Sequence, residues 1–238
     1  MKVLITGATG FIGRHVVLAL KEKGHQIVAL TRDPESAGFR IPSHCEIRLW
    51  RPELEKPEGL KNAEVVIHLA GAGVADERWS SARKREIIHS RIHSTRNLVR
   101  ALEETEQKPK VLISASAIGF YGDTGDTVPH ESSSPGLGFL SEVCQEWEKE
   151  ILKTKALGIR TVALRIGFVL GHGSTAMNRL LPPFKMGLGG PLGTGKQWMS
   201  WIHVEDVASF ICYAVKNPKI SGIYNAVAPE PVSNKKFA

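Results

Sequence analysis

The chain begins MKVLITGATGFIG, residues 1–13. Residues 3–5 form an apolar run typical of a buried strand, and glycines follow with two residues between each successive pair. Apolar residues then recur at helical spacing over residues 11–20. A strand that passes through closely spaced glycines into a helix is a phosphate cradle, because the first N–H groups of the helix point at the anion.

Each glycine of this turn has its own predicted role. Gly7 permits the tight turn, Gly10 lets a pyrophosphate approach the backbone, and Gly13 lets the helix pack closely on the strand. A glycine-rich turn without a ligand is the alternative, but the strand before it and the helix after it favour a dinucleotide site. The cofactor contacts predicted in this segment are Gly7, Thr9, Gly10, Phe11, Ile12 and Gly13.

Length and composition indicate an ordinary globular chain. Its 238 residues are 42% hydrophobic and 23% charged, enough for one α/β domain with a full core. No apolar stretch reaches the roughly 18 residues of a membrane span. A strand beginning at residue 3 leaves no place for a signal peptide, and the three dispersed cysteines read as reduced thiols. We therefore expect a cytoplasmic protein without a metal site or a membrane partner.

The charge balance is basic, with a formal net charge of +7 and a pI of about 9.4. Basic and acidic residues nevertheless alternate through most of the chain, and residues 83–85 are its only tight basic run. Such a run is usually a solvated helix face. We do not expect nucleic acid as a partner, since no basic stripe is present. A modest positive field also favours a cofactor that carries several phosphates.

Short apolar runs alternate with helical periodicity along the chain. This alternation predicts an α/β fold with a doubly wound parallel sheet, the Rossmann fold. After residue 119 a polar loop is expected up to residue 138, and Gly158 is a natural helix stop. The predicted strands are 27–30, 47–49, 65–69, 111–113 and 161–164, and the predicted helices are 81–102, 142–154 and 204–215.

The amino-acid composition changes after Gly171. Residues 180–195 are rich in leucine, proline and glycine, which predicts loops that form walls of a substrate pocket. We expect residues 1–170 to form the NADP-binding domain and residues 171–238 a small, incomplete substrate-side subdomain. The last residues resemble a helix opening, so we also expect the chain to be truncated there.

The end of the second predicted strand bears on the choice between NAD and NADP. An acidic side chain at this place would accept from the ribose 2′-OH and select NAD. Here Thr31 takes the usual acidic place and Arg32 follows, offering a hydroxyl and a guanidinium to a 2′-phosphate. Asp33 is the competing NAD interpretation, but before Pro34 it is typical of a turn. We predict NADP, with a solvated strand-end arginine as the alternative for Arg32.

Several stretches together resemble the extended short-chain dehydrogenase/reductase superfamily, and within it the atypical epimerase branch often labelled sugar-nucleotide epimerase. The resemblance covers nearly the whole chain. The stretches that carry it are Thr6–Gly13, His68–Ala72, Arg78-Trp79, Ser90-Arg91, Ser114–Ser116 leading to Tyr121-Gly122, Trp147-Glu148, Leu164-Arg165, Gly187–Pro191 and His203–Asp206.

The resemblance implies further site residues. Leu69, Ala70 and Gly71 are expected along the ribose and pyrophosphate of the cofactor. Glu86 and Arg91 are expected at the cofactor, with a surface ion pair as the alternative. Leu170 is expected near the nicotinamide, with core packing as the alternative, and a nucleotide sugar is the expected small-molecule substrate.

The superfamily also implies a catalytic Ser or Thr with a Tyr and a Lys in the spacing Y-x-x-x-K. Ser116 matches the serine and is the predicted catalytic residue. The aligned stretch carries Phe139 and Val143 in place of tyrosine and lysine, and no other Y-x-x-x-K occurs. Phenylalanine exchanges no proton and valine carries no charge.

Three hypotheses remain for the chemistry. In the first, another side chain serves as the catalytic acid, and the candidates are Tyr121, Cys144 and His203. The structural alternatives are, in the same order, a loop tyrosine, an inert core thiol and a helix cap. Hydride transfer proceeds with an external proton donor while Ser116 polarises a carbonyl. Or the chain is a silent NADP(H)-binding sensor or scaffold. We predict an NADP(H)-binding, oxidoreductase- or epimerase-like protein, and the sequence does not specify its oligomeric state.

Overall fold

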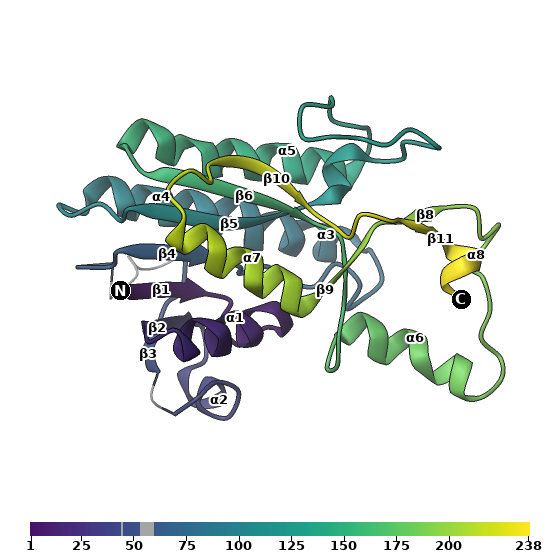
Figure 1. Ribbon diagram of the computed structural model, residues 1–238, viewed down its shortest axis with the longest axis horizontal. Helices are drawn as coiled ribbons and strands as arrows, with labels where there is room; N and C mark the ends of the chain where they lie inside the picture. The colour runs from purple at the N-terminus through teal and green to yellow at the C-terminus, as the bar shows by residue number, and fades with distance from the viewer. Residues whose placement is uncertain (44, 53–59) are drawn as a thin grey trace.

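The computed structural model describes residues 1–43, 45–52 and 60–238. Its centre is a seven-stranded sheet in the order β10-β6-β5-β4-β1-β2-β3, in which all neighbouring strands are parallel (Figure 1). The strands are β1 (Lys2–Thr6), β2 (Gln26–Thr31), β3 (Glu46–Leu49), β4 (Val65–His68), β5 (Val111–Ala117), β6 (Arg160–Ile166) and β10 (Gly222–Ala226). The chain winds outward from β1 to β3 and then from β4 to β10, so the order reverses between β1 and β4. This is the predicted doubly wound Rossmann fold.

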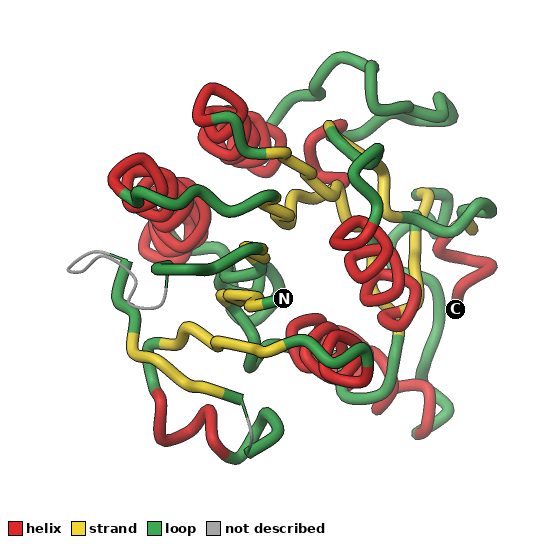
Figure 2. Tube along the Cα trace, turned by 60° about the vertical axis from the view of Figure 1, so that its left-hand side comes forward, coloured by secondary structure: helices red, strands yellow, loops and turns green. Residues whose placement is uncertain are grey.

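Helices cover both faces of the sheet (Figures 1 and 2). On one face, α1 and α7 pack on Val3 and Ile5 of β1; on the other, α4 and α5 pack around Leu4 of the same strand. The alternation of Val3, Leu4 and Ile5 between two cores explains the unbroken apolar run of a buried parallel strand. The helices are α1 (Phe11–Glu22), α2 (Pro34–Gly38), α3 (Ser81–Ile88), α4 (Ser94–Glu104), α5 (Phe139–Leu152), α6 (Thr175–Lys185), α7 (Val204–Lys216) and α8 (Asn234–Phe237).

The single helix predicted over residues 81–102 is interrupted. A π-helical segment, His89–His93, joins α3 to α4. Such single-turn insertions shift the phase of the side chains that follow, and they are frequent at functional sites. The periodicity of the apolar residues did not reveal this insertion, because Ile88 and Ile92 still face inward.

The loop expected after residue 180 is in part a helix. Helix α6 contains Pro182 and Pro183, and Ser174 caps its start by accepting from the Met177 N–H at 3.4 Å. The prolines lie in the second half of the helix, which ends two residues after Pro183, so few backbone hydrogen bonds are lost. No side chain of α6 is buried, which left no apolar face for the sequence pattern to reveal.

Strand β10 was also not predicted. It lies at the sheet edge and its first four residues are only partly buried, so it lacks the apolar run of the central strands. Two small sheets follow residue 166: β7 (Phe168–Leu170) pairs with β9 (Trp201–His203), and β8 (Trp198–Met199) pairs with β11 (Val232–Ser233). The C-terminal part therefore contributes both to the main sheet and to the smaller ones, and the division at residue 170 stays a prediction.

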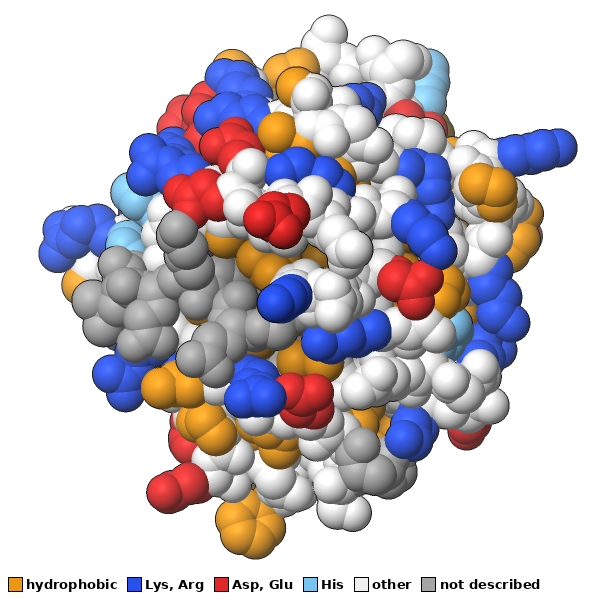
Figure 3. Space-filling model, turned by 90° about the vertical axis from the view of Figure 1, so that its left-hand side faces the viewer, with side chains coloured by type: hydrophobic (Ala, Val, Ile, Leu, Met, Phe, Trp, Pro, Cys, Tyr) orange, Lys and Arg blue, Asp and Glu red, His pale blue; other side chains and the backbone are white. Residues whose placement is uncertain are grey.

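Charge is mixed on the surface at the amino ends of the strands. Lys and Arg side chains alternate there with Asp and Glu rather than forming one basic stripe (Figure 3). Among the described residues, no helix is both long and apolar enough to cross a bilayer. The same residues contain no group of three or more His, Cys, Asp or Glu side chains able to hold a metal ion.

Candidate functional site

A cavity of about 660 Å³ opens at the carboxyl ends of β1, β2 and β4, where the strand order reverses. In an open α/β sheet this is the place where ligands bind. The cavity brings together most of the residues predicted from the sequence to contact the cofactor: Gly7, Thr9, Gly10, Thr31, Arg32, Leu69, Ala70, Gly71 and Glu86. Their contact with a cofactor stays a prediction.

The glycine turn forms one wall of this cavity, and its packing leaves no room for side chains. Gly7 has φ +72°, and a Cβ there would lie 2.6 Å from the carbonyl carbon of Leu69. A Cβ on Gly13 would lie 2.1 Å from the Gly7 oxygen. Gly10 starts α1 without a side-chain cap, so the first N–H groups of the helix remain available for an anion.

The end of β2 provides the second wall. Asp33, expected in a turn, caps the start of α2 instead, and its carboxylate accepts from the Ser36 N–H at 3.1 Å. Thr31 Oγ1 accepts from the Asp33 N–H at 3.2 Å. Arg32 is exposed and lines the cavity. The acidic competitor for the ribose is therefore engaged with the backbone, whereas the guanidinium lies at the cavity.

Helix α3 and the start of the π-helical segment provide the opposite wall, of which the sequence predicted only Glu86. Arg85 and His89 line the cavity one turn apart, with Glu86 between them in sequence. Arg85 and His89 are four residues apart, so the sequence indicates that they share one helix face. It does not indicate that this face is turned toward the cavity, because that depends on how α3 packs. Other lining residues that sequence reasoning missed are Ser36, Arg40, Trp50, Ser90 and Ser94.

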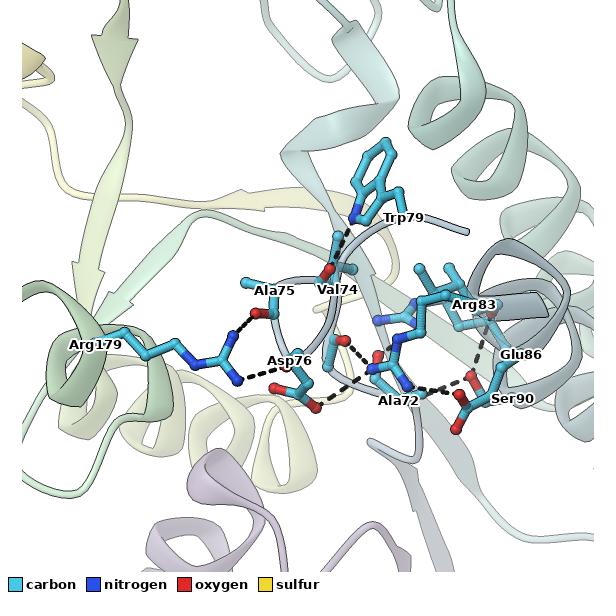
Figure 4. Close-up of polar contacts among 12 residues, drawn as sticks. Ala72, Val74, Ala75, Asp76, Trp79, Arg83, Glu86, Ser90 and Arg179 are labelled. Atoms are coloured by element: carbon cyan, nitrogen blue, oxygen red, sulfur yellow. Dashed lines mark hydrogen bonds and ion pairs between the residues drawn. The ribbon is translucent and has the colours of Figure 1, made fainter. Parts of the chain in front are cut away.

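The loop from β4 to α3 lies between two arginines (Figure 4). Arg83, 5% exposed, donates to the Gly73 carbonyl and to Glu86 Oε2, the latter at 2.5 Å, and lies 3.4 Å from Asp76 Oδ2. From α6, Arg179 donates to the backbone carbonyls of Ala75 and Asp76. The two guanidinium groups therefore donate hydrogen bonds to three backbone carbonyls of this irregular loop.

The predicted residues Glu86 and Arg91 contribute differently. Glu86 lines the cavity but is paired with Arg83. Arg91 is partly buried and is not among the lining residues; its Nη1 donates to the Ala72 carbonyl at 2.9 Å, and its guanidinium lies 5.4 Å from the Trp147 ring. In this geometry Arg91 supports the backbone of the cavity wall from behind.

Ser116 lies outside the cavity lining. It is 3% exposed, and its Oγ donates to Glu148 Oε1 at 2.6 Å. Arg165 forms a buried, bidentate pair with the same carboxylate, at 2.8 Å to each oxygen. The Ser116 hydroxyl thus belongs to a buried ionic cluster, and its catalytic role stays a prediction. Leu170, Phe11, Ile12 and Gly13 also lie outside the cavity lining.

The alternative acids have structural partners. Tyr121 is buried, accepts from Arg165 Nη1 at 2.8 Å and lies 2.7 Å from Asn225 Oδ1. Burial raises the pKa of Cys144 to about 11, so this thiol is inert. His203 caps α7 by accepting from the Glu205 N–H at 3.4 Å. These contacts agree with the structural alternatives for all three side chains.

Helix α5 carries Phe139 and Val143, the two residues that the resemblance aligns with the tyrosine and lysine of the superfamily. Phe139 begins α5 and packs edge-on against Trp79, with ring centroids 5.6 Å apart, while Lys84 Nζ lies 5.1 Å from the Phe139 ring. Val143 is 4% exposed within the same helix. Neither side chain can exchange a proton with a substrate.

Taken together, the fold and the cavity define a Rossmann-type dinucleotide-binding protein. A model of the NAD dependent epimerase/dehydratase family matches residues 3–226, and the chain belongs to this family. The family confirms the resemblance to the extended short-chain dehydrogenases/reductases.

Individual relatives agree with this assignment. The epimerase family protein YfhF of Bacillus subtilis (strain 168) is 40% identical over 239 residues, which cover 100% of this chain and 77% of that protein. The crystal structure of human epimerase family protein SDR39U1 (isoform 2) with NADPH matches with a TM-score of 0.87 at 31% identity, covering 100% of this chain and 78% of that one. MoeE5 in complex with UDP-glucose and NAD matches with a TM-score of 0.83 at 27% identity, covering 99% and 79%.

Proposed function

We propose that this chain binds NADP(H) in the 660 Å³ cavity, with the pyrophosphate over the glycine turn and the adenosine 2′-phosphate toward Arg32. One observation carries the proposal: a glycine cradle that excludes side chains lies in the same cavity as an exposed guanidinium at the end of β2. The NADPH in the human relative supports it.

The residues present fit a phosphorylated dinucleotide. A Cβ on Gly7 or Gly13 would collide with backbone atoms, and the uncapped start of α1 offers N–H donors to an anion. Arg32, Arg40 and Arg85 bring three positive charges to the cavity lining, while Asp33 and Glu86 are already engaged. When bound, the nicotinamide of such a cofactor donates or accepts a hydride.

Binding is tested by titrating the chain with NADPH and NADH, followed by nicotinamide fluorescence and by thermal shift. We expect saturable binding of NADPH that is tighter than that of NADH. Arg32→Ala should weaken NADPH by about tenfold or more and NADH little, because a charge-assisted hydrogen bond to phosphate is lost. Arg100→Ala, an exposed arginine of α4 outside the cavity, is the matched control.

Two results would contradict this proposal. Absence of any fluorescence or thermal response at millimolar NADPH rejects cofactor binding. An equal loss of NADPH and NADH affinity in Arg32→Ala shows that this residue does not recognise the 2′-phosphate.

For the reaction, we propose an oxidoreductase or epimerase that acts on a nucleotide sugar. The support is family membership together with the UDP-glucose bound by MoeE5. In this proposal Ser116 polarises a sugar carbonyl and the proton comes from the substrate or from water.

A second candidate, a silent NADP(H)-binding sensor, is favoured by a specific observation. Phe139 and Val143 stand where the resemblance implies a catalytic tyrosine and lysine, and the Ser116 hydroxyl donates to Glu148. Incubation with NADPH and a panel of nucleotide sugars and simpler carbonyl compounds distinguishes the two candidates. Turnover that is abolished by Ser116→Ala supports the enzyme, whereas tight NADPH binding without turnover supports the sensor.

A further inference from the structure

A line of buried polar side chains runs beside the cavity from β1 into the helix layer. Thr6 Oγ1 lies 2.7 Å from His68 Nδ1, and His68 Nε2 lies 2.9 Å from Thr95 Oγ1. Trp147 Nε1 donates to the same Thr95 oxygen at 2.9 Å. Because Thr6, His68 and Thr95 are each 0% exposed, their polar atoms depend on one another for hydrogen bonds.

The available donors determine where the imidazole proton lies. Thr95 Oγ1 donates its only proton to the Arg91 carbonyl at 2.6 Å, so toward His68 it can only accept. Nε2 of His68 must therefore carry the proton. Nδ1 is then the acceptor for the Thr6 hydroxyl, which in turn accepts from the Ala70 N–H at 3.3 Å.

The opposite tautomer leaves this cluster unsatisfied. A proton on Nδ1 would point at the Thr6 oxygen, and the Thr6 hydroxyl proton would have no other acceptor among the described residues. Nε2 would then face the Thr95 oxygen without a proton between them. Each loss would leave a buried polar atom unpaired, which destabilises the folded chain.

Both ends of this line hold the wall of the cavity. At one end, Thr6 accepts from Ala70, which lines the cavity next to the glycine turn. At the other end, Thr95 holds the carbonyl of Arg91, whose side chain donates to the Ala72 carbonyl at 2.9 Å. The backbone over residues 69–72 is thus tied to β1 by Thr6 and to the π-helical segment by Arg91, and by Ser90, which accepts from the Ala72 N–H at 3.0 Å. His68 joins Thr6 to Thr95 between these attachments.

We propose that His68, held as its Nε2–H tautomer between Thr6 and Thr95, is a positioning residue that fixes the backbone of residues 69–72 against the glycine turn and thereby sets NADPH affinity. The inference rests on the proposed NADP(H) binding. Complete burial lowers the pKa of His68 to about 4, so the ring is neutral at pH 7, as this tautomer requires. His68 itself is not among the residues that line the cavity.

The first test is Thr95→Val, which keeps the shape of the side chain and removes the oxygen that accepts from His68 and Trp147. We expect its Kd for NADPH to rise by about tenfold or more, with circular dichroism unchanged. Thr154→Val is the matched control, because Thr154 is also 0% exposed and hydrogen-bonded to a buried threonine, Thr161, at 2.7 Å, away from the cavity. Its NADPH affinity should equal that of the wild type.

A folded Thr95→Val protein with wild-type NADPH affinity overturns the positioning role, as does an equal loss of affinity in Thr154→Val. The second test does not depend on any variant. In the ¹⁵N spectrum of the histidine-labelled wild-type chain at pH 7, the His68 ring should show a protonated Nε2 and an unprotonated Nδ1. A protonated Nδ1 overturns the proposal. If the wild-type chain fails to bind NADPH, the proposed function fails, whereas this spectrum still decides the tautomer.

Discussion

At the scale of single residues, the charge of the cavity lining depends on which charged side chains already have a partner within the protein. Asp33 caps a helix and Glu86 is paired with Arg83, whereas Arg32 and Arg85 present guanidinium groups at the lining. The positions of Arg32 and Asp33 could be predicted from sequence, because a strand end and a following proline fix them locally. Arg85 could not be predicted, because its position depends on how a distant helix packs.

Gly7 adopts a positive φ in the turn and also lines the cavity, and a comparison with Gly24 separates these two roles. Gly7→Ala places a Cβ 2.6 Å from the Leu69 backbone, so we expect loss of NADPH binding and a stability loss of about 2–4 kcal/mol. Gly24→Ala is the control, since Gly24 has a similar φ of +74° with nothing within 4 Å. It should cost only about 1–2 kcal/mol and leave NADPH affinity unchanged. Urea denaturation and NADPH titration measure both effects, and equal affinities in the two variants would contradict the prediction.

At the scale of elements, the attachment of α6 explains why its prediction failed. The helix carries two internal prolines and buries no side chain, so neither propensity nor periodicity indicates it. Its contact with the β4–α3 loop is polar and runs through Arg179. The main-sheet strands other than β10 were predictable because their apolar runs report burial on both faces of a sheet.

Removing this contact should loosen the loop and the helix together. In Arg179→Ala, we expect amide hydrogen exchange to accelerate by about tenfold over residues 74–78 and 175–185. The loop loses the donor to two of its carbonyls, and α6 loses its polar contact with the loop. Lys185→Ala, at the far end of α6, is the control. Global stability should change by less than about 1 kcal/mol, since Arg179 is exposed. Unchanged exchange in the loop would show that Arg179 does not hold it.

At the scale of the whole molecule, two cores on opposite faces make the sheet one cooperative unit. Alternating strands and helices were sufficient to predict this arrangement. The sequence did not predict which residue would serve as an acid, because Phe139 and Val143, where the resemblance implies tyrosine and lysine, cannot exchange a proton. The buried cluster of Ser116, Glu148 and Arg165 joins β5, α5 and β6, and its contacts span 32 and 17 residues, so it forms only once α5 packs on the sheet.

Global stability should depend on pH through two buried histidines. Burial lowers the pKa of His68 to about 4 and also lowers the pKa of His25, whose ring nitrogens have no hydrogen-bond partner among the described residues. The unfolded chain takes up these protons near pH 6.5 and the folded chain does not, so stability is fully present above that pH and falls below it. His68 alone should cost about 2 kcal/mol between pH 7.5 and 5.

Urea denaturation at the two pH values measures this difference. His25→Leu removes one of the two rings, so the difference between pH 7.5 and 5 should become smaller in that variant. A wild-type stability that stays constant or increases on acidification would contradict the assignment of these histidines as neutral in the folded chain.

Every residue that lines the cavity lies between Thr6 and Ser94, although the sheet is completed only by β10. During synthesis the amino-terminal part leaves the ribosome first. The polypeptide that forms the cavity is therefore translated before the strands that carry Ser116 and Leu170 exist. In the order of translation, the residues that line the cavity precede the two residues for which catalysis and a nicotinamide contact are predicted.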